Sequence, residues 1–449
     1  MSDVSAAERY AEVTAEILSR APESDIDPRL DRVRTVLDLL GDPQRNFRVI
    51  HVTGTNGKTS TARMIDALMR GRGLRVGRYT SPHLRTVRER IVVDGEPVTQ
   101  ERFVEAYDDI RPFLEMADSM NDVRLSFFEI LTVMAYAVFA DTPVDVAVVE
   151  VGMGGTWDAT NVVDGDVAVI TPIGIDHTDY LPDTLDGIAE EKAGIIKPQS
   201  VTVMAQQPLP AAEVLVRHAA EVGSTVAREG LEFGVTSREV AVGGQQLAVK
   251  GLTGSYDNLF LPLFGEHQAS NAAVAIASVE AFSASEDAAG LDPVIVGEAL
   301  AGLESPGRME VVRTSPTVIA DAAHNPAGMI ATAAAVEEAF SFSRLIGVVA
   351  VMADKDVEGI LEPLEPLLDE LVVTRNSSPR SLDPVQLSDI AKQIFGEDRV
   401  HLAPRLDDAI DQAVGLAEAG GEFGGVGVLV TGSVVTSGDA VHLLRGSVE

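Results

Sequence analysis

The chain has 449 residues, with 35 Lys and Arg against 69 Asp and Glu, which gives a formal net charge of −34. Hydrophobic residues make up 45% of the sequence, a composition typical of globular proteins, and the length predicts roughly two or three domains. The acidity argues against a dedicated nucleic-acid binder and against adhesion to an anionic membrane. The absence of cysteine excludes disulfides, thiolate metal sites and cysteine nucleophiles.

The N-terminus and the apolar runs give no sign of targeting to a membrane. The first residues are partly acidic and lack the apolar core of a signal peptide. Apolar runs such as 144–149 and 346–352 are far shorter than the ~20 residues that span a bilayer. We therefore expect a cytoplasmic protein that binds neither nucleic acid nor membrane.

Up to residue 304, short β-branched apolar runs alternate with longer amphipathic stretches, which indicates an α/β fold with a parallel sheet. The predicted strands are residues 48–52, 74–79, 144–150, 166–170 and 201–204. The predicted helices are residues 6–19, 30–40, 58–70, 100–118, 127–139, 266–282 and 293–303. Between about 224 and 264, short alternating runs rich in Gly and Thr predict a small antiparallel sheet attached to this domain.

Pro306 and Gly307 follow a helical pattern and mark the best candidate for a linker. Beyond them the alternation of strands and helices restarts. The predicted strands are residues 317–320, 345–351, 370–374, 400–402 and 427–431, with helices between them and at 434–444. We therefore expect a first domain at 1–304 and a second α/β domain at 308–449.

Residues 48–60 predict a strand that runs into a glycine-rich turn and then a helix, an arrangement typical of phosphate binding. Gly54 and Gly57 let the backbone curl around an anion, Lys58 can reach the phosphates, and the Thr59 hydroxyl can bind Mg²⁺. Val52 stands where the strict P-loop motif has its first glycine, so the motif is a shorter form. An incidental Gly-Lys-Thr turn is the alternative, but only six residues of the chain are lysine.

Acidic and histidine side chains follow two further predicted strands. Glu150 ends the strand at 144–150, and Asp176, His177 and Asp179 follow the strand at 166–170. Ligands bind at the carboxyl ends of parallel strands, so Glu150 and His177 are candidate metal ligands. A solvated acid and a structural histidine are the alternatives. Lys192, taken by itself, resembles a solvated helix residue.

These stretches resemble the folylpolyglutamate synthase/dihydrofolate synthase family of the Mur ligase superfamily, in order along nearly the whole chain. The matching motifs are GTNGKTS (54–60), YTSPHL (79–84), RERI (88–91), FFE (127–129), EVGMGG and DATN (150–161), DHTDYL (176–181), EEKAGIIKP (190–198), GEHQASNAAVA (265–275), PGRME (306–310), DAAHNP (321–326) and VTGSV (430–434). The resemblance implies a P-loop-containing, Mur-ligase-like ATPase domain with a small antiparallel β subdomain, followed by a C-terminal Rossmann-like α/β domain.

The resemblance also implies an ATP site and two Mg²⁺ sites. The implied ATP contacts are Gly54, Thr55, Asn56, Gly57, Lys58, Thr59, Ser60, Asn271, Arg308 and Asp321. Thr59, Ser81 and Glu150 would hold the first Mg²⁺, and His177 and Lys192 the second. In this family the lysine is carbamylated by CO₂, which turns a cation into an anionic oxygen ligand. Carbamylation needs a partly neutral amine, so we expect a lowered pKa for Lys192.

Four further residues are implied at the substrates. Phe128 would lie against the pterin, Arg90 would bind a substrate carboxylate, and Ser433 would lie near the incoming glutamate. His324 would orient or deprotonate the amine and so act in catalysis together with Lys58 and Lys192. The arginines at 85, 88 and 90 are suited to attract an anionic folate, and a solvated run of arginines is the alternative.

The expected reaction is ATP-dependent amide formation between L-glutamate and dihydropteroate or a folate, through an acyl phosphate, by a monomer that acts on small molecules. A peptidoglycan or cyanophycin-type ligase is a rival within the enzymes, although too few residues precede Gly54 for the UDP-sugar domain of muramyl ligases. An ATP-binding switch is a rival from another class. The sequence leaves open whether the enzyme makes dihydrofolate, extends folates or does both.

Overall fold

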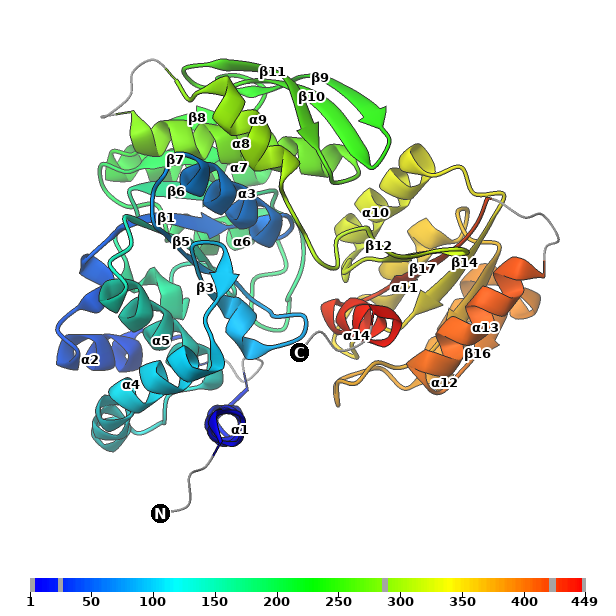
Figure 1. Ribbon diagram of the computed structural model, residues 1–449, viewed down its shortest axis with the longest axis horizontal. Coiled ribbons are helices and arrows are strands. Elements are labelled where there is room, and N and C mark those ends of the chain that lie inside the picture. Colours follow the sequence, from blue (N-terminus) through cyan, green and yellow to red (C-terminus); the bar gives the residue numbers. More distant parts are fainter. Residues whose placement is uncertain (1–4, 23–26, 285–289, 420–424, 446–449) are drawn as a thin grey trace. The chain divides into compact units, whose positions relative to one another are not determined.

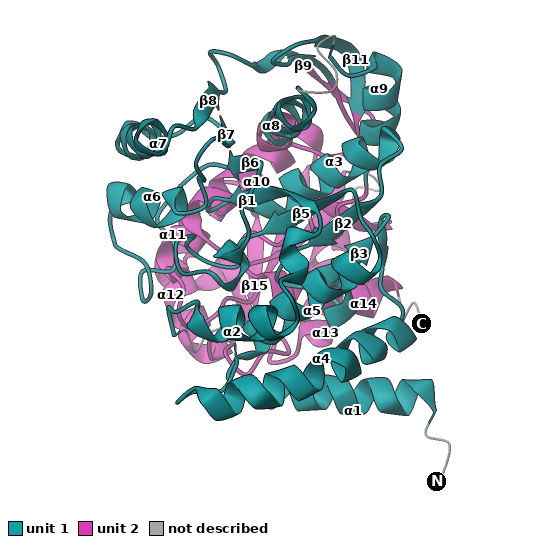
Figure 2. Cartoon of the chain, turned by 90° about the vertical axis from the view of Figure 1, so that its left-hand side faces the viewer, with its two compact units in different colours: residues 1–237, 247–260, 270–303 teal, residues 238–246, 261–269, 304–449 magenta. Residues whose placement is uncertain are grey.

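The computed structural model describes residues 5–22, 27–284, 290–419 and 425–445. The chain forms two compact units, which Figure 2 distinguishes by colour. Unit 1 consists of residues 1–237, 247–260 and 270–303, and unit 2 of residues 238–246, 261–269 and 304–449. Two short segments that precede the predicted linker therefore belong to the second unit. No helix within the described ranges is long and apolar enough to cross a membrane.

Unit 1 contains an eight-stranded sheet in the order β4-β3-β2-β5-β1-β6-β7-β8 (Figure 1). The strands are β1 (Arg48–Thr53), β2 (Val76–Tyr79), β3 (Ile91–Val93), β4 (Glu96–Pro97), β5 (Val146–Glu150), β6 (Val167–Ile170), β7 (Val201–Met204) and β8 (Thr225–Arg228). The six neighbouring strands β2-β5-β1-β6-β7-β8 are all parallel. At one edge of the sheet, β3 pairs antiparallel with β2, and β4 pairs antiparallel with β3. Each strand predicted between 48 and 204 is present.

Helices cover both faces of this sheet, which explains why its central strands are apolar at nearly every position. The helices are α1 (Ala6–Leu18), α2 (Asp31–Leu39), α3 (Lys58–Gly71), α4 (Gln100–Met120), α5 (Phe127–Asp141), α6 (Leu185–Ala193), α7 (Leu209–Val222), α8 (Glu266–Ser283) and α9 (Pro293–Ala301). Val49 of β1 and Ala147 of β5 are partners in register and pack with α1, α2, α4 and α5. Side chains alternate along a strand, so the next residues face the opposite side, where α3 packs against β2, β5 and α9.

The segment predicted as a small sheet divides into two parts. Thr225–Arg228 forms β8 and pairs in parallel with β7, so it extends the main sheet, contrary to the expectation for residues 224–264. The remaining strands form a separate three-stranded sheet in the order β11-β10-β9. They are β9 (Gly234–Ala241), β10 (Gly244–Lys250) and β11 (Ser255–Leu261). The four-residue β8 is too short for its register in the main sheet to be visible from periodicity alone.

Unit 2 contains a six-stranded sheet in the order β12-β13-β17-β14-β15-β16. The strands are β12 (Glu310–Thr314), β13 (Thr317–Ala320), β14 (Arg344–Val349), β15 (Glu370–Val373), β16 (Val400–Leu402) and β17 (Val426–Thr431). All pairs are parallel except β12 with β13. The predicted strands of this region are present, and β12 is an edge strand that the sequence did not reveal.

Two helical layers enclose this second sheet. The helices are α10 (Pro326–Ala339), α11 (Val357–Leu361), α12 (Pro384–Phe395), α13 (Leu406–Glu418) and α14 (Val434–Arg445). Ile319, Val349 and Val373 face the layer of α10, α11 and α12. The alternate residues, such as Val348 and Val430, face α13 and α14. The carboxyl ends of β13, β14, β15 and β17 therefore lie at one edge of a sheet that is buried on both faces.

Candidate active site

The glycine-rich turn connects β1 to α3, as the sequence predicted. Gly57 has a φ of 88° and is the residue before α3. A Cβ atom on Gly57 would lie 2.5 Å from the Asn271 side-chain oxygen, and one on Gly54 would lie 1.9 Å from Thr171 Oγ1. A side chain on either glycine would therefore have to displace the neighbouring residue. The close approach also shows that Asn271, predicted as a nucleotide contact, lies directly against the loop.

Two lysine side chains converge on the carbonyl oxygen of Gly54. Lys58 Nζ donates to it at 3.2 Å and to the Thr55 carbonyl at 3.1 Å. Lys192 Nζ, which comes from α6, donates to the same Gly54 oxygen at 2.8 Å. Two amines from separate elements therefore lie beside a loop whose shape suits a phosphate.

Lys192 is buried, with only 4% of its surface exposed. Interpreting this residue as a solvated helix position is therefore wrong. Burial, together with the nearby charge of Lys58, lowers the pKa of Lys192 to about 7, although Asp176 and Asp158 oppose the shift. The expected lowered pKa is present, and its first cause is loss of hydration.

The loop after β5 fixes the position of Lys192. A Cβ atom on Gly155 would lie 2.6 Å from the Glu191 carbonyl oxygen and 3.0 Å from Lys192 Cα. The Asn161 side-chain amide donates to the carbonyl oxygens of Thr156 and Gly194 at 3.0 and 3.1 Å. The glycine therefore lets two main-chain segments touch, and the asparagine ties them together.

The three predicted ligands of the first Mg²⁺ come from three elements and meet at Glu150. Thr59 Oγ1 donates to Glu150 Oε1 at 2.9 Å, and the main-chain nitrogen of Ser81 lies 3.4 Å from Oε2. Glu150 is only 1% exposed and sits at the end of β5, between β1 and β2 in the sheet. Parallel strand order thus gathers residues that lie up to 91 positions apart.

His177 follows β6 in a left-handed conformation, with a φ of 56°. Its main-chain nitrogen donates to Asp176 Oδ1 at 2.8 Å, and its Nε2 lies 3.8 Å from Oδ2 of the same carboxylate. Across the described residues, no group of three or more His, Asp or Glu side chains is arranged to hold a metal. The predicted ligand set relies instead on hydroxyl groups and on a modified lysine.

The predicted substrate residues of unit 1 lie in different surroundings. Phe128 is half-buried, and a Cβ atom on Gly152 would lie 2.5 Å from its ring. Arg90 is only 1% exposed, donates from Nε to His83 Nδ1 at 2.9 Å and lies over the ring of Phe127. The interactions of Arg90 are therefore largely internal, which the sequence pattern did not indicate.

In unit 2 the predicted residues lie at strand ends. Asp321 follows β13 and accepts hydrogen bonds from the main-chain nitrogens of Met309 and Ala323 and from the Thr332 hydroxyl. His324 Nδ1 lies 2.9 Å from the Ala322 carbonyl oxygen. A carbonyl can only accept, so Nδ1 carries the proton and the neutral ring has its acceptor at Nε2.

Ser433 directly precedes α14 and is 2% exposed. Arg308 is half-buried just before β12.

Two residues next to these predicted ones, His267 and Asn376, were not predicted from the sequence. Burial lowers the pKa of His267, and the charge of Arg308 adds to this effect while Asp321 opposes it. Asn376 is buried and contacts Ser433. The GEHQASN motif contained the signal for His267, whereas no motif singled out Asn376.

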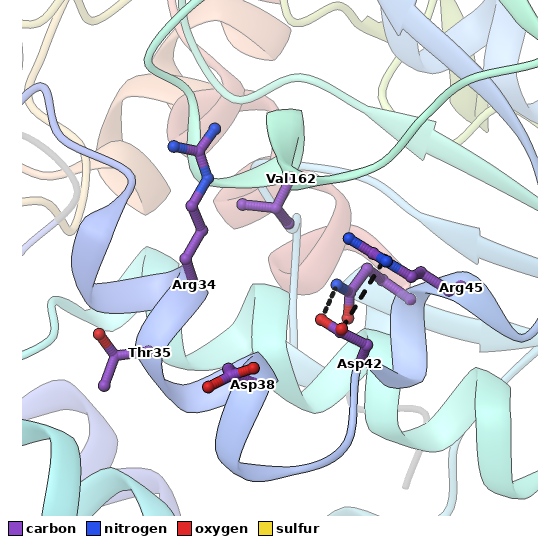
Figure 3. A pocket seen from close by; sticks show the side chains of 7 residues that line it. Arg34, Thr35, Asp38, Asp42, Arg45 and Val162 are labelled. Carbon is purple, nitrogen blue, oxygen red and sulfur yellow. Dashed lines mark hydrogen bonds and ion pairs between the residues drawn. The ribbon is translucent and has the colours of Figure 1, made fainter.

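A cavity of about 420 Å³ lies in unit 1 (Figure 3). Its lining comes from α2, from the short helices η1 (Pro43–Arg45) and η3 (Ala159–Val162), and from the turn between α2 and η1. The lining residues are Arg34, Thr35, Asp38, Asp42, Gln44, Arg45 and Val162. None of the residues predicted for the active site belongs to it.

The sequence and the fold both match known proteins. Residues 52–279 match the Mur ligase middle domain, and residues 307–434 match the Mur ligase glutamate ligase domain. A dihydrofolate synthase/folylpolyglutamate synthase of Mycobacterium tuberculosis is 50% identical over 94% of this chain and 91% of its own length. A folylpolyglutamate synthase of Lacticaseibacillus casei is 35% identical over 78% and 82%.

Among solved structures, the folylpolyglutamate synthase of M. tuberculosis complexed with ADP aligns with a TM-score of 0.94 and 48% identity, covering 99% of this chain and 100% of that one. The chain therefore belongs to the Mur ligase family, in its dihydrofolate synthase/folylpolyglutamate synthase branch. This membership confirms the predicted fold class and the predicted class of enzyme, an ATP-dependent ligase of folate metabolism.

Proposed function

We propose that the chain joins the amine of L-glutamate to a carboxylate of dihydropteroate, of a folate, or of both. The names of its relatives support these substrates. The observation that carries the proposal is the convergence of Lys58 and Lys192 on the Gly54 carbonyl at a glycine-rich loop. In this arrangement Lys58 supplies positive charge where an ATP phosphate would bind, and Lys192 lies beside it.

A carboxylate reacts poorly with an amine, so it has to be activated first. Its oxygen attacks the γ-phosphorus of ATP, the bond to the β-phosphate oxygen breaks, and an acyl phosphate and ADP result. The amine of glutamate then attacks the acyl carbon, loses a proton and expels phosphate. In the first step, Lys58 and the loop nitrogens hold the phosphates in line and offset their negative charge. Asn56, Ser60 and Asn271 complete the proposed nucleotide site in unit 1, and Arg308 and Asp321 are the residues of unit 2 for which we propose nucleotide contacts.

The donor chemistry at Glu150 fits Mg²⁺. The hydroxyls of Thr59 and Ser81 and the carboxylate of Glu150 are hard oxygen ligands, which this ion prefers. Mg²⁺ bound there would offset charge on the transferring phosphoryl group. The hydrogen bond from Thr59 to Glu150 already orders two of the three residues.

For the second metal position we propose His177 together with Lys192 in its carbamylated form. A pKa of about 7 leaves much of the lysine neutral near neutral pH. The neutral amine adds to CO₂, one N–C bond forms, and a proton is released. The product is an anionic oxygen ligand in place of an ammonium group, so the donor set becomes compatible with a cation.

The remaining proposed roles concern the two organic substrates. Phe128 packs against the pterin, and Arg90 attracts a substrate carboxylate. Ser433 lies near the incoming glutamate, and Nε2 of His324 orients or accepts a proton from its amine. We further propose that the protein is a cytoplasmic monomer, and that neither nucleic acid nor membrane takes part.

The first test is ADP release that depends on glutamate, measured with Mg-ATP and bicarbonate. Parallel reactions contain dihydropteroate or tetrahydrofolate. Turnover with both substrates identifies a bifunctional synthase, and turnover with one names the activity. A folded protein that binds ATP but shows no glutamate-dependent turnover with either would contradict the folate substrates and favour another acid or amine.

A further inference from the structure

Three side chains in unit 2 form a closed triangle of hydrogen bonds. Asn376 follows β15, Ser433 is the residue before α14, and Thr436 belongs to the first turn of α14. Asn376 Nδ2 donates to Ser433 Oγ and to Thr436 Oγ1, both at 3.0 Å. The two hydroxyl oxygens lie 2.7 Å apart. All three residues are at least 94% buried, so water does not compete for these bonds.

The available protons fix the direction of every bond in this triangle. Thr436 Oγ1 donates its one proton to the Ala350 carbonyl oxygen at 2.8 Å, because a carbonyl can only accept. The bond between the hydroxyls must therefore use the Ser433 proton. The Asn376 side-chain oxygen accepts from the Ser378 nitrogen at 3.0 Å, so the orientation of its amide is fixed as well.

With these directions, the Ser433 hydroxyl uses its one proton and both of its lone pairs in hydrogen bonds within the protein. Its proton goes to Thr436, and its two lone pairs accept from Asn376 Nδ2 and from the Thr436 main-chain nitrogen, the latter at 2.9 Å. The last bond is the one that an N-cap serine makes to the third residue of its helix. A hydroxyl in this state has no donor or acceptor left for a ligand.

We propose that Asn376 is a positioning residue for glutamate, and that Ser433 acts by placing the main chain at the start of α14 rather than by offering its hydroxyl. The proposal rests on the proposed function, which puts Ser433 near the incoming glutamate. Through Ala350, Asn376 and Ser433, the triangle ties together the segments that follow β14, β15 and β17. Removing one corner loosens all three segments at the edge where substrates bind.

A neighbouring contact supplies a matched control. Ser377 donates from its main-chain nitrogen and its hydroxyl to the Asp439 carboxylate, at 2.8 and 3.0 Å. This contact ties the same loop to the same helix, but it involves no atom of Ser433. If Asn376 only docks the loop onto α14, Asp439→Ala should have the same effect as a change at Asn376.

The experiment measures KM for glutamate, KM for ATP, kcat and the melting temperature of Asn376→Asp, Ser433→Ala, their double variant and Asp439→Ala. The aspartate is close in shape to asparagine but cannot donate to the hydroxyls. We expect Asn376→Asp and Ser433→Ala each to raise KM for glutamate about tenfold or more, equivalent to ~1.4 kcal/mol, with KM for ATP unchanged. The double variant should be no worse than the poorer single variant, since both changes open the same triangle. Asp439→Ala should leave KM for glutamate near the wild-type value.

Multiplied effects in the double variant would overturn the proposal, because the Ser433 hydroxyl would then act independently of Asn376. An unchanged KM for glutamate in a folded Asn376→Asp enzyme, or an equal rise in Asp439→Ala, would overturn it as well. If Asn376→Asp does not fold, Thr436→Val takes its place and should raise KM, whereas Thr436→Ser should restore it. A wild-type enzyme without glutamate-dependent ADP release marks failure of the proposed function instead.

Discussion

The Nζ atom of Lys192 lies 2.8 Å from the carbonyl oxygen of Gly54, 138 residues away in the sequence. A buried amine therefore touches the first residue of the phosphate-binding loop, and the charge of Lys58 lies nearby. The local sequence around Lys192 gives no reason for such a contact. We therefore expect the protonation of Lys192 to affect both stability and the proposed catalysis.

We expect Lys192 to make the free energy of unfolding depend on pH. Burial lowers its pKa to about 7 from the ordinary value of 10.5. Below about pH 7, Lys192 is protonated in both the folded and the unfolded chain. The folded chain then bears the full free-energy cost of a buried positive charge. Between about pH 7 and pH 10.5 only the unfolded chain keeps the proton on Lys192. The contribution of Lys192 to the free energy of unfolding therefore rises with pH over this range.

Urea unfolding in CO₂-free buffer at about pH 7, 8 and 9 measures this rise. Trp157, the only tryptophan of the chain, packs in the same cluster as Leu181 in unit 1 and reports its unfolding by fluorescence. Lys192→Met should be more stable than wild type at pH 7 and should lack the rise. An identical pH slope in the variant would assign the effect to other groups.

Lys192→Ala should lower kcat at least about a hundredfold if Lys192 is the proposed metal ligand, because loss of a direct ligand costs more than the roughly 10–100-fold typical of residues that only hydrogen-bond to a ligand. Binding of ATP to the loop should persist in calorimetry. Labelling with ¹³C-bicarbonate should give a carbamate NMR signal in wild type that the variant lacks. A wild-type enzyme that is fully active without this signal would contradict carbamylation.

Gly155→Ala should disturb the position of Lys192. Its new methyl group would lie 2.6 Å from the Glu191 carbonyl oxygen, so the end of α6 has to move. We expect activity to fall about tenfold or more, since a displacement near 1 Å can cost a hundredfold. Gly415→Ala in α13 is the control, because its methyl group meets nothing within 4 Å and should stabilise the helix by about 0.5–1 kcal/mol. Equal activity in both variants would show that α6 tolerates the shift.

Arg78 and Asp66 form an ion pair that is almost completely buried, between β2 and α3. Arg78→Met should lower the free energy of unfolding by about 3–5 kcal/mol, because it leaves a buried carboxylate without its main partner. Arg78→Met combined with Asp66→Leu should recover much of this loss. Urea titration of the three proteins measures both effects, and a double variant less stable than the single one would refute the explanation.

Several parts of the fold were accessible from local patterns. The strand at 201–204 and the strands at 317–320 and 400–402 were predicted with the bounds of β7, β13 and β16. Short runs rich in β-branched residues, bounded by turn residues, give the signal for these strands. The strands β12 and β8 lie at the edges of their sheets and were not predicted there. Their pairing depends on neighbours that are distant in the sequence.

The sequence by itself determined the family, the glycine-rich turn before α3 and the types of residue that the chemistry needs. Those features reside in short stretches, where backbone freedom and side-chain chemistry act locally. Only the tertiary structure decided that Lys192 is buried against Gly54, that Arg90 is enclosed beside Phe127, and that Asn376 occupies the hydroxyl of Ser433. Burial and hydrogen-bond saturation depend on which elements become neighbours, and parallel strand order makes neighbours of residues that are far apart in the chain.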